Sequence, residues 1–249
     1  MKQYLKSSML PAISLATGIL TMLMRFWLIG LGRDDHGLLC AGNFPDVVSW
    51  ILTALMMGIL FLGTWNLNEA AKYSFNFPAS VRAAFGILLG ALGVLIASVI
   101  ELFSAPDAIT VWSSVLGLLT APALVFVARC RKTGLRPSIL FHGIACIFLM
   151  FHLIAHYRLW SGIPQLQSYA FELLAIIFLM LSCYQRAAFD INQGKRRPYA
   201  FFSMAALFFC IAAIPGSDNP VFFIGCAAWM YLTPCNLKSL PSKFPKNDA

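Results

Sequence analysis

Three of the four histidines in this chain lie within one apolar stretch, at His142, His152 and His156. If the stretch is helical, the three fall within an arc of roughly 80°, because each residue turns a helix by about 100°. His152 and His156 are four residues apart, so their side chains should lie about 6 Å from each other. Histidine titrates near neutrality, so a buried stripe of this kind suits the binding of a proton, an ion or a polar substrate.

Other ionisable residues interrupt apolar stretches at a similar depth. Glu101 lies near the end of one stretch, Glu172 about one turn into another, and Arg25 about two turns from the end of the first. Ionisable groups are costly in a bilayer, so each needs a partner or a function. The sequence therefore predicts a substrate- or proton-binding site that faces outward, formed by Arg25, Glu101, His152, His156 and Glu172.

The sharpest form of this prediction is an ion pair between His156 and Glu172. The break between their two stretches is short, so the segments should be antiparallel neighbours with these two side chains nearly level. Two alternatives remain open. Arg25 could pair with a carboxylate and the histidines could hydrogen-bond between helices, with a structural role only. Arg25 and Glu101 could instead reach the interface unaided, because long side chains extend toward the head groups.

Metal and enzyme chemistry receive less support. The HxxxH spacing of His152 and His156, with Glu172 as a third ligand, could hold zinc, but such pairs arise by chance and no HExxH is present. We therefore predict no metal and no other cofactor. The membrane histidines share one segment, whereas bis-histidine haem needs ligands on different helices. No GxSxG or GxxxxGK[ST] motif is present, so an enzyme is not favoured.

The elements that would position these residues are predicted to be membrane helices. The chain is 59% hydrophobic and 11% charged, with mean hydropathy +0.76, whereas a soluble domain has about 25% charged residues. Apolar residues run in blocks close to the roughly 20 residues that a helix needs to cross a bilayer. We predict an all-α, polytopic bundle of about eight spans, at about 9–31, 46–67, 81–103, 109–129, 138–160, 168–189, 199–215 and 221–237.

The basic residues predict the orientation of this bundle. All but three of the 18 Lys and Arg residues fall at the N-terminus, at the C-terminus, or within or at the edges of every second break, the exceptions being Arg25, Arg33 and Arg158. Basic residues favour the cytoplasmic side, so both termini should be cytoplasmic in a bacterial-type cell membrane. The formal charge of +8 follows from this bias, and nucleic acid is not an expected partner.

No break is long enough for a soluble domain, so residues 1–238 should form one transmembrane domain, followed by a polar, disordered cytoplasmic tail at 239–249. The span at 199–215 is short and could form, with 221–237, a hairpin that enters the membrane and returns. Gly86, Gly90 and Gly93 should let their helix pack closely against a neighbour.

The favoured function is a small transporter or permease for a small molecule or ion, with the lipid bilayer as its surroundings. A sensor or accessory subunit that binds a partner membrane protein is the alternative, and a membrane-embedded enzyme is the third hypothesis.

Overall fold

The computed structural model describes residues 2–31, 42–65, 67–161 and 169–238, and the secondary structure in these ranges is entirely helical. The predicted disordered tail at 239–249 lies outside the described residues, as do Arg33 and most of the break around it. The all-α prediction is thus confirmed for the part of the chain that the structure describes.

Nine helices are described, eight of them long. Six are long and apolar enough to cross a membrane, and the chain is accordingly a multi-pass membrane protein. The helices are α1 (Lys2–Gly30), α2 (Phe44–Trp65), α3 (Tyr73–Asn76), α4 (Val81–Ser104), α5 (Ala108–Thr133), α6 (Ile139–Trp160), α7 (Ala170–Asp190), α8 (Arg196–Ala213) and α9 (Pro220–Cys235). The six span candidates are α1 from Met9 onward, α2, α4, α5, α6 and α7.

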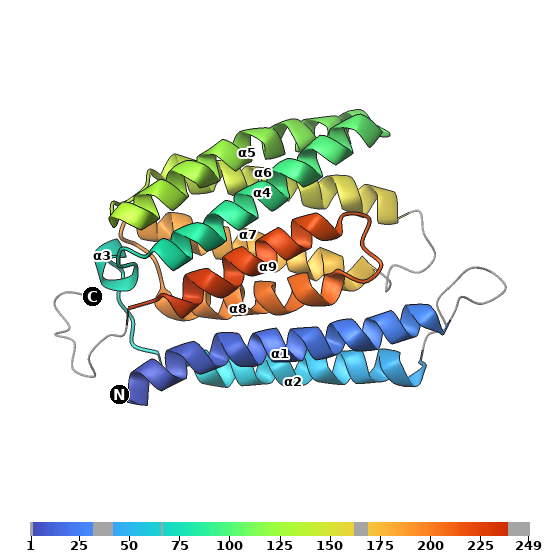
Figure 1. Cartoon of the computed structure of the whole chain (residues 1–249), viewed down its shortest axis with the longest axis horizontal. Coiled ribbons are helices and arrows are strands. Elements are labelled where there is room, and N and C mark those ends of the chain that lie inside the picture. The colour runs from blue at the N-terminus through green and yellow to red at the C-terminus, as the bar shows by residue number, and fades with distance from the viewer. Residues whose placement is uncertain (1, 32–41, 66, 162–168, 239–249) are drawn as a thin grey trace.

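The eight long helices run alternately in opposite directions along one bundle (Figure 1). The start of α1 and the end of α9 lie at the same end of the bundle as the short helix α3, which we call the α3 end. The helix ends that flank the α1–α2, α4–α5, α6–α7 and α8–α9 connections lie at the opposite end, which we call the far end.

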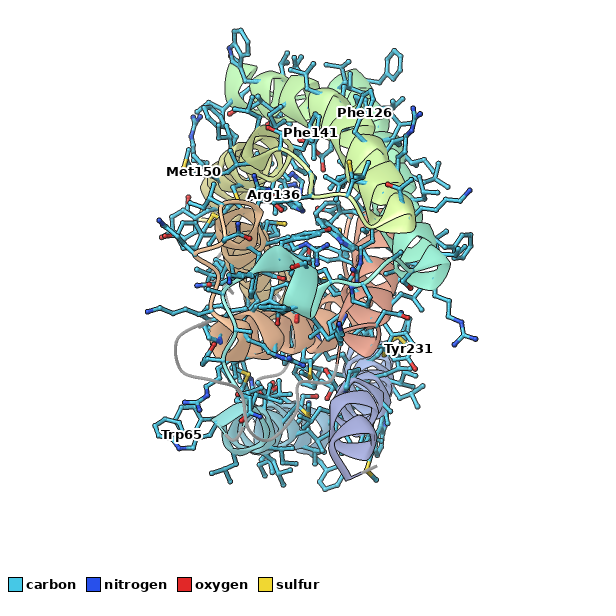
Figure 2. All side chains as sticks on the ribbon, turned by 90° about the vertical axis from the view of Figure 1, so that its left-hand side faces the viewer. Trp65, Phe126, Arg136, Phe141, Met150 and Tyr231 are labelled. Carbon is cyan, nitrogen blue, oxygen red and sulfur yellow. The ribbon has the colours of Figure 1, made fainter. Side chains whose placement is uncertain are left out.

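Six of the helices form a closed ring. Each of α4, α5, α6, α7, α8 and α9 packs against the next, and α9 returns to α4. The α1–α2 hairpin packs on the outside of this ring, chiefly through α1 against α8. Figure 2 views the bundle from the α3 end, with α3 in front of the middle of the ring and the α1–α2 hairpin beyond one edge. The six helices therefore enclose an interior that is separated from lipid and from the α1–α2 hairpin.

Glycines close the ring between α4 and α9, as the sequence predicts. A Cβ atom on Gly93 would lie 3.0 Å from the Cα of Gly225, and one on Gly90 would lie 2.9 Å from the Cβ of Trp229. A Cβ on Gly86 would come within 2.7 Å of Leu232. The two helices thus approach at backbone distance, which only small residues allow.

Helix α8 occupies the centre of the molecule. It packs against α1, α2, α7 and α9, and residues 203–213 are all buried. With 18 residues it is about 27 Å long, and the 16 residues of α9 span about 24 Å, against a hydrocarbon layer of about 30 Å. Because α8 is enclosed by protein, the helices around it set its length, rather than the thickness of the hydrocarbon layer.

Candidate functional site

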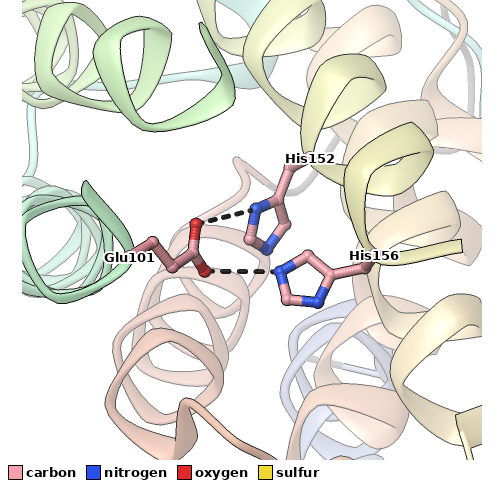
Figure 3. A group of neighbouring side chains, drawn as sticks. All are labelled: Glu101, His152 and His156. Carbon is pink, nitrogen blue, oxygen red and sulfur yellow. Dashed lines mark hydrogen bonds and ion pairs between the residues drawn. The ribbon is translucent and has the colours of Figure 1, made fainter. Parts of the chain in front are cut away.

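One carboxylate and two imidazoles meet in the ring interior near the far end. Glu101 projects from α4 between His152 and His156 of α6 (Figure 3). Its Oε1 lies 3.3 Å from Nε2 of His156, and its Oε2 lies 3.6 Å from Nδ1 of His152. Each imidazole therefore faces a different oxygen of the same carboxylate, an arrangement that can hold a cation among the three groups.

The helices bring these side chains together for identifiable reasons. His152 and His156 occupy successive turns on the face of α6 that points into the ring. Glu101 lies one turn before the end of α4. Ser98, one turn further in on the same helix, has a buried hydroxyl with no hydrogen-bond partner among the residues that the structure describes. On α5, a Cβ on Gly117 would clash with Ser98 of α4 and with Phe148 of α6. Because this residue is a glycine, side chains of α4 and α6 can come together beside α5.

Aromatic rings enclose the histidines. The His152 ring lies 5.3 Å from Phe148 and 4.9 Å from Phe222, between ring centroids, and is 3% exposed. The His156 ring lies 5.1 Å from Trp160, and its side chain is 15% exposed. The site is thus dry on the His152 side and partly open on the side of His156 and Glu101.

The prediction that His156 pairs with Glu172 was wrong, because the carboxylate beside His156 belongs to Glu101. Helices α6 and α7 do form the expected antiparallel pair. However, the imidazole of His156 turns into the ring toward α4, where Glu101 is the acid that it meets. Glu172 lies instead within electrostatic range of Arg25 and Asp218 and close to Ser217, on the other side of α7.

The five predicted site residues therefore fall into two groups. Glu101, His152 and His156 form the first group. Arg25 and Glu172 form the second, in which the Arg25 guanidinium donates a hydrogen bond of 2.6 Å to the carbonyl of Ala212 and lies 4.5 Å from the centre of the Phe171 ring. Ala212 is in the last turn of α8, where carbonyls have no partner within the helix, so Arg25 caps that helix.

His142 belongs to the α3 end rather than to the other two histidines. Its Nδ1 lies 2.5 Å from Oδ2 of Asp190 on α7, and both residues are buried. Beside it is a cavity of about 10 Å³, large enough for about one water molecule. The cavity is in the ring interior and has a polar wall made by His142, Ser182, Arg186, Tyr199 and Thr233.

Aromatic residues and two buried arginines close the α3 end. The Arg186 guanidinium lies 3.7 Å from the centre of the Phe77 ring, with Tyr73 and Tyr199 at 5.8 and 5.9 Å. Arg131, which is 0% exposed, donates to the carbonyls of Pro78 and Asn236. We call Tyr73, Phe77, Arg131, Arg186 and Tyr199 the α3 plug.

Sequence reasoning missed the α3 plug because it counted both arginines with the loop charges, Arg131 just beyond the span at 109–129 and Arg186 at the end of the span at 168–189. They lie inside α5 and α7, within about one turn of the helix ends. The aromatic residues of 73–77, between two predicted spans, were the available signal.

At the far end, the outer rim of the site is polar. Arg158 on α6 forms an ion pair of 3.2 Å with Asp107, the N-cap of α5. Hydrogen bonds from Thr110, together with the Arg158 charge, lower the pKa of Asp107. The rim is therefore charged at neutral pH, next to the more deeply placed Glu101.

No family model, curated protein or solved structure matches the chain.

Proposed function

We propose that the chain is a small transporter or permease in a bacterial-type cell membrane, with a cation-binding site that opens outward. The observation that supports this proposal is the Glu101–His152–His156 cluster. It places a carboxylate that is 12% exposed within 3.3–3.6 Å of two imidazoles inside a closed ring of helices. Burial of ionisable groups at membrane depth is costly, and a binding role accounts for it better than packing does.

The charge distribution supports a cytoplasmic α3 end and eight spans. The described part of the far end has two basic residues, Arg25 and Arg158, and five acidic residues, Asp46, Glu101, Asp107, Glu172 and Asp218. The basic residues at the α3 end are Lys2, Lys6, Lys72, Arg82, Arg129, Arg131, Lys132, Arg136, Arg186, Lys195, Arg196, Arg197 and Lys238. Such an asymmetry is typical of an inward-facing surface.

The ring interior supplies the elements of a closed pathway. Polar groups occur at both of its ends, the Glu101 cluster at one and the His142 cavity at the other. Between them lie Phe148 and Leu149, 1% and 3% exposed, with Phe222 at 6.4 Å from Phe148. The α3 plug then seals the cytoplasmic side. In this proposal the described conformation is closed at the α3 end, which faces the cytoplasm, and the site lies nearer the outside.

Transport is tested with the purified full chain in liposomes that contain cation-sensitive dyes. Wild-type protein should move at least one monovalent or divalent cation faster than empty liposomes. The isosteric variant Glu101→Gln should abolish this flux, because it removes the charge that binds the cation. Asp107→Asn is the matched control, since it neutralises a carboxylate at the same end and asparagine still caps α5. Equal flux in wild type and Glu101→Gln would contradict the proposal.

The accessory-subunit hypothesis gives a different result in the same preparation. A chain of that kind would move no cation and would co-purify with another membrane protein in a fixed ratio. Wild-type protein that is folded, free of partners and active in the liposomes excludes it.

A further inference from the structure

We propose that Glu101, His152 and His156 bind a divalent transition-metal ion of the zinc class, with the fourth coordination position open. This inference names the cation of the proposed function and rests on it for movement across the membrane. The binding site itself rests on geometry alone.

The ligand atoms already lie near the spacing that such an ion requires. Three ligand atoms, one from each residue, all fall within 4.8 Å of one another. In a tetrahedral zinc site with bonds of about 2.0–2.1 Å, neighbouring ligand atoms are about 3.3 Å apart. The two carboxylate–imidazole distances are 3.3 and 3.6 Å. The two imidazole nitrogens lie within 4.8 Å of each other, so a closure of at most about 1.5 Å between them would complete the set.

An unpartnered buried nitrogen points to a ligand. His152 is 3% exposed, and its Nδ1 has no hydrogen-bond partner within the described part of the chain, although Glu101 lies at 3.6 Å. A buried polar atom without a partner carries a desolvation cost. A metal ion held between His152 and Glu101 would satisfy this nitrogen and the carboxylate together.

The identity of the ligands selects the class of ion. Calcium takes six to eight oxygen ligands and magnesium keeps an octahedral shell of oxygens, so one carboxylate and two imidazoles suit neither. Two nitrogens and one oxygen suit zinc, cobalt, iron and manganese. Three protein ligands with an open fourth position are typical of sites where the ion or a bound water exchanges, whereas structural zinc sites are closed by four.

The surroundings fit an exchangeable ion. Phe148, Phe222 and Trp160 hold the two imidazole rings in place. The Glu101 and His156 side chains, at 12% and 15% exposure, leave an approach from the far end. Asp107 at the rim is paired with Arg158 at 3.2 Å and is not one of the three ligands.

Metal binding is tested on the full chain in detergent after removal of metal with a chelator. Co²⁺ serves as the probe because its visible absorption differs between tetrahedral and octahedral sites, and Zn²⁺ displaces it. We expect one Co²⁺ per chain with a tetrahedral spectrum, displaced by one equivalent of Zn²⁺. Glu101→Gln, His152→Gln and His156→Gln should each weaken binding by at least tenfold, while Asp107→Asn should bind as wild type does.

Titration of the wild-type protein with Co²⁺ and Zn²⁺ is sufficient to test the proposed metal site. Absence of Co²⁺ and Zn²⁺ binding at micromolar concentration would overturn it and leave a hydrogen-bonded cluster. Binding that all three glutamine variants retain would also overturn it, because the ion would then be at the surface.

The two proposals can fail separately. A chain that binds zinc at these residues and moves no cation in liposomes keeps the metal site and loses the transport function. A chain that moves other cations and binds no transition metal keeps the transport function and loses the metal site.

Discussion

At the scale of single residues, a histidine–carboxylate contact occurs at the α3 end as well as at the candidate site. His142 and Asp190 are 1% and 3% exposed and lie 2.5 Å apart, and the carboxylate also lies in the electrostatic range of Arg186. Such a pair is weak evidence of net stabilisation, but loss of one partner leaves the other buried without compensation. The pair is therefore expected to be strongly coupled.

A double-mutant cycle measures this coupling. Asp190→Ala and His142→Ala should each lower the free energy of unfolding by about 3–5 kcal/mol, because each leaves an uncompensated polar group in the interior. The double variant should cost less than the sum of the two. The measurement is unfolding by SDS titration in mixed micelles. Additive effects would show that the two side chains do not interact.

The sequence predicts which helix faces are buried better than it predicts which side chains contact each other across the ring. The expected burial of the histidine stripe is confirmed at His142 and His152, because helical periodicity depends only on local spacing. The partner of His156 depends on which helix lies across the ring, and no local pattern contains that order. The short connection between the two segments favoured Glu172, whereas the ring arrangement places Glu101 beside His156.

At the scale of elements, the α4–α9 contact should be the least tolerant of added volume. Gly93→Ala places a Cβ 3.0 Å from a backbone atom of Gly225, which cannot rotate away, so we expect a loss of about 1–3 kcal/mol. Gly90→Leu should cost more. Gly143→Ala on α6 is the matched control, because nothing lies within 4 Å of its Cβ and alanine favours the helix by about 1 kcal/mol. Thermal unfolding in detergent compares the three variants, and equal stability of Gly93→Ala and wild type would exclude a close contact.

Most ends of the predicted helices agree with the structure to within a few residues, because long apolar blocks are a strong local signal. The span predicted at 109–129 continues to Thr133 and brings Arg131 into the interior. Helix α3 was missed because four residues give no periodicity. The enclosure of α8 could not be predicted either, because its composition resembles that of a lipid-facing helix.

At the scale of the whole molecule, α8 and α9 decide the number of spans. Both are shorter than the bilayer core, so from length alone they could enter and return on one side. In the structure they run beside α1 and α2 from the α3 end to the far end, and Asp218 lies in the connection between them, exposed. If both cross, residue 218 is outside while Lys132 on α5 is in the cytoplasm.

Cysteine labelling tests this arrangement in intact cells. In a cysteine-free background, Asp218→Cys should react with a membrane-impermeant maleimide before permeabilisation, and Lys132→Cys only afterwards, because the positive α3 end stays in the cytoplasm. If both positions react only after permeabilisation, α8 and α9 do not cross and six spans remain. If Lys132→Cys reacts first and Asp218→Cys does not, the orientation is inverted, and Glu101, His152 and His156 would face the cytoplasm.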